Sequence, residues 1–114
     1  MYKAAVLMKN ISKKDTTHKE YVSIIWKILS QGSKEIASDL HRTYTIKPFT
    51  WNITAYTESD YTILFSSIKP EITACFFEGC KNLENQAILI EGSLYTFGNY
   101  YVIPDLDYIG DSNS

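Results

Sequence analysis

The period of the apolar residues changes repeatedly along this chain, and the order of these changes limits the folds that it can adopt. Residues 2–9 form a short apolar run of strand length. From residue 17 onward, apolar side chains recur every three or four positions, as in an amphipathic helix. Residues 49–56 then alternate apolar and polar side chains, which is the period of a half-buried strand. The pattern therefore predicts helices that pack on a sheet.

Capping and breaking residues set the ends of the first helical region. Thr16 or Thr17 is a suitable N-cap, and Gly32 ends the first helical pattern. Ser33 can then cap a second, shorter helix that continues to about Leu40. We therefore expect either a pair of helices or one broken helix between the first two strands.

The second half of the chain contains a predicted hairpin, a helix and a last β region. The polar residues 57–60 separate the alternating strand from residues 61–67, its expected hairpin partner. Pro70 is suited to the first turn of a helix, and Gly79 is predicted to end that helix. Residues 87–103 then return to aliphatic and aromatic side chains, which are typical of strands.

The order strand, helix, strand, strand, helix, strand is that of the ferredoxin-like fold, which is also the plan of the RNA-recognition motif. We therefore predict an α+β domain of the type βαββαβ, in which two helices pack on one face of an antiparallel sheet. Residues 2–9 are expected to form a central strand. The length of 114 residues suits one domain, which we place at 1–103. The acidic residues 104–114 are predicted to form a mobile tail.

Composition excludes several classes of protein. The chain has 45% hydrophobic and 21% charged residues, which is a globular composition. It has no apolar run of about 18 residues, and Lys9 interrupts the first segment too early for a signal peptide. We therefore expect a cytoplasmic protein without a membrane partner. Cys75 and Cys80 are predicted to be buried structural thiols, and we expect no metal and no cofactor.

Positive charge is concentrated in the first part of the chain. Residues 1–47 contain nine of the eleven Lys and Arg residues and four acidic residues, which gives a net charge of +5. Residues 48–114 contain the other two lysines and nine acidic residues, which gives a net charge of −7. The first segment is therefore suited to a polyanionic partner, which the second would repel. The alternative is a solvated surface that has no such partner.

Aromatic and basic residues form a joint pattern in the first segment and the strand that follows it. An apolar helix carries Trp26 in its middle, and a second short helix ends in Leu40 and His41. Lys47 follows six residues after the histidine, and residues 49–51 open the next strand with Phe-Thr-Trp. With the downstream segment 61–79, this pattern resembles the N-terminal domain of the CRISPR-associated RNA-processing endoribonucleases of the Cas-six type. The resemblance covers residues 18–103.

The resemblance implies a CRISPR-related RNA-binding protein whose partner is CRISPR repeat RNA or crRNA, and not DNA. Members of the family are metal-independent endoribonucleases that leave a 2′,3′-cyclic phosphate. The resemblance assigns catalytic roles to His41, which can give or take a proton, and to Lys47, which can stabilise negative charge on the phosphate. Family members with a Tyr-His-Lys set carry a tyrosine fifteen residues before the histidine, where this chain has Trp26. An indole does not transfer protons, so Trp26 either stacks on a base or fills the core.

Other basic residues are candidates for contacts with the RNA backbone. Arg42 can bind a phosphate with its planar guanidinium group, and Lys13, Lys14 and Lys19 can form a basic patch. Ordinary solvated side chains are the alternative for all four. His18 is either a second acid or base or a bystander at the start of a helix.

Three tyrosines in the last β region, Tyr95, Tyr100 and Tyr101, are candidates for stacking on bases. Alternation along a strand assigns some of them to the core instead.

Family members typically carry two such domains, and the resemblance covers the first. We therefore expect the chain to work as a half, to pair with another copy or a partner, or to have lost the activity. The non-enzymatic alternative is a protein that binds a CRISPR effector complex, either as a subunit or as a decoy inhibitor of the anti-CRISPR kind. A homodimer through an open sheet edge is a third possibility.

Overall fold

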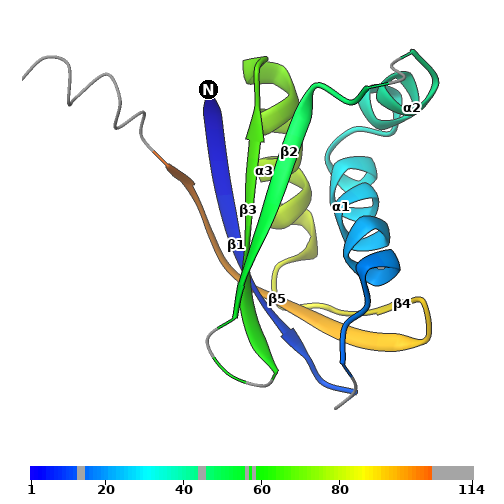
Figure 1. Ribbon diagram of the computed structural model, residues 1–114, viewed down its shortest axis with the longest axis vertical. Helices are drawn as coiled ribbons and strands as arrows, with labels where there is room; N and C mark the ends of the chain where they lie inside the picture. The colour runs from blue at the N-terminus through cyan, green and yellow to red at the C-terminus, as the bar shows by residue number, and fades with distance from the viewer. Residues whose placement is uncertain (13–14, 44–45, 56, 58, 104–114) are drawn as a thin grey trace, which may run out of the picture.

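The computed structural model describes residues 1–114 apart from 13–14, 44–45, 56, 58 and 104–114 (Figure 1). The predicted tail and two of the predicted RNA contacts, Lys13 and Lys14, therefore lie outside the described residues. The elements, in chain order, are β1 (Tyr2–Asn10), α1 (His18–Gly32), α2 (Lys34–Thr43), β2 (Phe49–Ala55), β3 (Asp60–Ser67), α3 (Pro70–Leu83), β4 (Ala87–Ile90) and β5 (Ser93–Ile103).

The strands form one antiparallel sheet in the order β2-β3-β1-β5-β4. β1 lies in the centre, as its apolar run predicted, and Ala4, Val6 and Met8 on this strand are buried. β2 and β3 form the predicted hairpin, with Ile53 opposite Ile63. This arrangement confirms the predicted α+β, ferredoxin-like class.

β4 is an addition to the predicted plan of four strands. It pairs with β5 at the edge of the sheet, and the two strands are joined by a two-residue turn. Both turn residues have positive φ, 50° at Glu91 and 83° at Gly92, which is the backbone of a tight hairpin. The β region predicted at 87–103 is thus a hairpin of two strands.

Within the described part of the chain, the helices leave one face of the sheet open. α1 and α3 pack on the other face, and α2 packs against α1 (Figure 1). Side chains alternate accordingly along β3, where Ile63 and Phe65 are fully buried in the core. Phe65 stacks on Phe76 of α3 with ring centroids 4.3 Å apart. A small hollow on the open face is lined by both polar and apolar residues: Lys3, Thr50, Trp51, Asn52, Leu64, Ser66 and Ile103.

α1 and α3 approach each other closely at two glycines. A Cβ atom on Gly79 would lie 1.8 Å from the carbonyl oxygen of Ile28, and one on Gly32 would lie 1.9 Å from that of Cys75. The prediction that Gly79 ends its helix is therefore wrong, because α3 continues to Leu83. Gly79 permits close packing of two helices and does not terminate one.

Both cysteines are buried and free, as predicted. The thiol of Cys75 donates a hydrogen bond to the carbonyl oxygen of Leu29 at 3.1 Å. Burial raises the pKa of both thiols, which keeps them protonated at neutral pH. No helix among the described residues combines the length and the hydrophobicity that a membrane crossing requires.

Candidate functional site

Trp26 and His41 are in contact where α1 and α2 meet. Trp26 is half-buried in the middle of α1, and its ring centroid lies 4.7 Å from that of the exposed His41. The indole also meets the ring of Phe49 on β2 nearly at right angles, at 5.7 Å. α2 extends to Thr43, slightly beyond the predicted end near Leu40 and His41, so His41 lies inside its last turn. Trp26 therefore links the core to a histidine at the surface.

Lys47 lies beside the same two rings. Its Nζ donates hydrogen bonds to the carbonyl oxygens of Leu40 at 3.0 Å and His41 at 3.1 Å, and it lies 5.8 Å from the centroid of the Trp26 ring. Carbonyl groups in the last turn of a helix lack partners within the helix, so the ammonium group caps α2. The distance to the indole is that of a cation–π contact. The fold thus brings together Trp26, His41 and Lys47.

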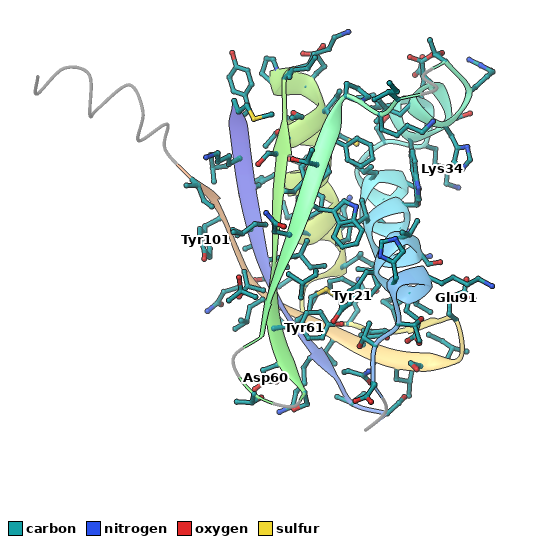
Figure 2. The ribbon with its side chains drawn as sticks, in the orientation of Figure 1. Tyr21, Lys34, Asp60, Tyr61, Glu91 and Tyr101 are labelled. Carbon is teal, nitrogen blue, oxygen red and sulfur yellow. The ribbon has the colours of Figure 1, made fainter. Side chains whose placement is uncertain are left out.

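A shallow groove between α1 and α2 adjoins these residues. It is lined by Ser23, Trp26, Lys27, Ser30, Lys34, Ala37, Ser38 and His41. None of these lining residues is acidic, and Figure 2 shows Lys34 where the two helices join. Neither Lys27 nor Lys34 is among the residues predicted from the sequence to contact RNA. Their positions in the sequence gave some indication, because Lys27 directly follows Trp26 and Lys34 is the first residue of the second helix.

Two of the predicted RNA contacts form ion pairs at the surface. Arg42 lies 3.7 Å from Asp39, one turn earlier on α2, and Lys19 lies 3.8 Å from Glu91 in the β4–β5 turn. All four side chains are substantially exposed, and such pairs contribute little to stability. Neither Arg42 nor Lys19 is among the residues that line the groove.

The three candidate tyrosines have three different environments. Tyr95 is fully buried and donates a hydrogen bond to the carboxylate of Glu20. Tyr100 is half-buried, and its ring packs edge-on against Phe77 of α3 at 5.0 Å. Tyr101 is 48% exposed and projects away from the helices (Figure 2). Of the three, Tyr101 has the most accessible ring.

Comparison with known proteins gives matches only at the level of structure. No family model matches the sequence, and no curated protein matches it significantly. A Cas6 product complex superposes on 88% of this chain with a TM-score of 0.68 and 21% sequence identity. The chain has a Cas6-like fold. A Cas6-related protein from Pyrococcus furiosus matches 91% of the chain with a TM-score of 0.66 and 12% identity. A CRISPR associated protein Cas6 matches 91% with a TM-score of 0.53 and 16% identity.

The Cas6-like fold seen here spans somewhat less than half of each of those structures, between 40% and 49% of their chains. Within it, Trp26 comes from α1, His41 from α2, and Lys47 from the segment before β2. An imidazole can transfer a proton, and an ammonium group can stabilise an oxyanion. The indole can stack on a flat ring, but its N–H only donates hydrogen bonds and does not serve as an acid or a base.

Proposed function

We propose that this chain binds CRISPR-related RNA in the groove between α1 and α2, with Trp26, His41 and Lys47 at one end of the groove. The observation that carries the proposal is the convergence of an aromatic ring, an imidazole and two further lysines, Lys27 and Lys34, on a surface whose lining residues include no acid. Ring faces bind bases and lysines bind phosphates, so this combination suits RNA. The Cas6-like fold supports the same proposal.

His41 is the proposed proton-transfer group for cleavage of the bound RNA. Cleavage without a metal requires removal of the proton from a ribose 2′-hydroxyl and delivery of a proton to the leaving 5′-oxygen. His41 is exposed and belongs to the end of α2, where Lys47 adds positive charge for the phosphate. The product of this route is a 2′,3′-cyclic phosphate.

The test is cleavage of CRISPR repeat RNA by the purified protein in EDTA. We expect a product ending in a 2′,3′-cyclic phosphate, and we expect His41→Ala to lower the rate at least about 100-fold, the usual contribution of a general acid or base. Lys81→Ala, an exposed change on α3, is the control and should cleave at the wild-type rate. An unchanged rate in His41→Ala would remove His41 from the mechanism.

A non-enzymatic binding protein is the second candidate, and three observations favour it. The indole of Trp26 does not serve as an acid or a base, and the ammonium of Lys47 already donates to two helix carbonyls. Partly exposed Tyr2 and Val102 also border an apolar hollow beside Phe77, which suits a protein partner such as a CRISPR effector complex. Binding of repeat RNA or of an effector complex without any cleavage would select this candidate.

A further inference from the structure

A second pair of rings lies nearer the start of α1 and repeats the arrangement of the first. The exposed imidazole of His18 stacks on the half-buried indole of Trp51 on β2, with centroids 5.6 Å apart and ring planes 29° apart. Tyr21 contacts the same indole at 6.1 Å and meets Tyr61 edge-on at 5.5 Å (Figure 2). The arrangement is the same as at Trp26: the indole contacts both a second aromatic ring and an exposed histidine.

The two pairs are connected along α1 and β2. Phe49 and Trp51 are two residues apart and therefore lie on the same face of β2, and Phe49 contacts Trp26. We call the five rings His18, Trp51, Phe49, Trp26 and His41 the aromatic seam. β2 is an edge strand of the sheet that the described residues form. Its outer backbone groups beside these rings pair with no strand of that sheet and can hydrogen-bond to a ligand.

The spacing of the two pairs indicates the form of ligand that fits the seam. His18 precedes Trp26 by eight residues on one helix, which is about 12 Å along the axis. Successive stacked nucleotides are separated by about 3.4 Å, so two platforms this far apart suit an extended single strand better than a continuous base stack. Stacking on aromatic rings tolerates any base, because every base has a π-face.

We propose that His18 and Trp51 form a second base-stacking platform for single-stranded RNA, which extends the Trp26–His41 site along the aromatic seam. This inference rests on the proposed RNA binding and adds to it the path of the strand. The platform leads from the groove towards the start of α1. The indole of Trp51 supports one face of the His18 imidazole, and the exposed imidazole offers a base a ring on which to stack.

The chain contains two tryptophans, which makes each platform visible by fluorescence. Trp26→Phe leaves Trp51 as the sole indole, and Trp51→Phe leaves Trp26. We expect titration with single-stranded oligouridine to change the emission of both variants in a saturable manner. A response from Trp26 without one from Trp51 would overturn the second platform and leave the proposed function intact. No binding by the wild-type chain would overturn both.

Affinity measurements provide the matched control. His18→Ala removes an exposed side chain and should weaken binding of oligouridine at least about fivefold, the lower end of the contribution of one stacked base. Tyr101→Ala removes a partly exposed ring on the open face of the sheet and should leave the affinity unchanged. If Tyr101→Ala weakens binding and His18→Ala does not, the RNA lies on the open face and the inference is wrong.

Discussion

The carboxylate of Glu20 is buried between the start of α1 and β5, and hydrogen bonds decide its charge state. The residue is 8% exposed and forms a capping box with Thr17, whose hydroxyl donates to Oε1 at 3.2 Å. Tyr95 donates to the other oxygen. Burial raises the pKa of Glu20, but the hydrogen bonds from Tyr95 and Thr17 outweigh burial and lower it below its ordinary value. Burial, and to a smaller extent the hydrogen bond to this carboxylate, raise the pKa of Tyr95 to about 12.

Tyr95→Phe tests the contribution of this hydrogen bond. The change keeps the buried ring but removes the donor to a buried carboxylate, so we expect the free energy of unfolding at neutral pH to fall by about 1–3 kcal/mol. Urea denaturation measures the loss. Tyr100→Phe is the control, because its half-buried ring contacts Phe77 and its hydroxyl has no hydrogen bond among the described residues. An equal loss in both variants would show that the bond to Glu20 is not the cause.

The same variant has a predicted pH dependence. Because the folded pKa of Glu20 is lowered, its contribution to stability is complete above the ordinary carboxyl pKa of about 4.3 and is lost as the pH falls through the folded value. Tyr95→Phe brings the folded pKa closer to the ordinary one. We therefore expect the stability difference between wild type and variant to shrink as the pH is lowered from 6 towards 3, as measured by urea denaturation at each pH.

At the level of elements, the crossing of α1 and α3 depends on the absence of a side chain at Gly79. Alanine in a helix interior is favoured over glycine by about 1 kcal/mol. Here the added Cβ would lie 1.8 Å from a backbone oxygen of Ile28, so the helices would have to separate. We expect Gly79→Ala to lower the free energy of unfolding by about 1–3 kcal/mol despite its helix propensity.

Gly98→Ala on β5 is the matched control for this change. Its Cβ would lie 3.5 Å from the nearest atom, the carbonyl oxygen of Leu7, which is ordinary contact. We expect a change within about 0.5 kcal/mol, measured by the same denaturation experiment. A Gly79→Ala protein as stable as the control would mean that the two helices are not held together as closely as the structure indicates.

The elements that the sequence predicted well are those whose signals are local. The alternation at β2, the apolar run at β1 and the cap at Thr17 each reflect the period or the hydrogen bonds of a single element. The prediction at Gly79 failed because the reason for that glycine is a neighbouring helix, distant in sequence. The division of 87–103 into two strands depends on the tight turn at 91–92, which the hydrophobic pattern did not reveal.

The candidate site was predictable in part for the same reason. The residue types at Trp26, His41 and Lys47 matched a family pattern, and the fold places them together. Lys27 and Lys34 were missed because only the packing of α2 against α1 decides which helix face borders a groove. The contact of His18 with Trp51 likewise joins residues 33 positions apart and has no local signal.

For the whole molecule, the fold separates the basic residues of segment 1–47 into those that form ion pairs and those that do not. Lys9, Lys19 and Arg42 form ion pairs with Asp60, Glu91 and Asp39. Lys27 and Lys34 form no ion pair with any of the described residues, and both line the groove beside Trp26. The positive surface available to a phosphate chain is therefore narrower than the net charge of residues 1–47 indicates.

Salt dependence measures how many of these charges contact RNA. Each phosphate contact to a single strand contributes about 0.7 to the slope of the logarithm of affinity against the logarithm of salt concentration. We expect the double variant Lys27→Ala/Lys34→Ala to lower the magnitude of that slope by about 1.4 for oligouridine, because two phosphate contacts are lost. Lys81→Ala removes one exposed charge from α3 and should leave the slope unchanged. The slope counts only the lysines that displace counterions from the phosphates. If the Lys81 variant flattens the slope and the groove variant does not, RNA is therefore bound through the face of α3 and not through the groove.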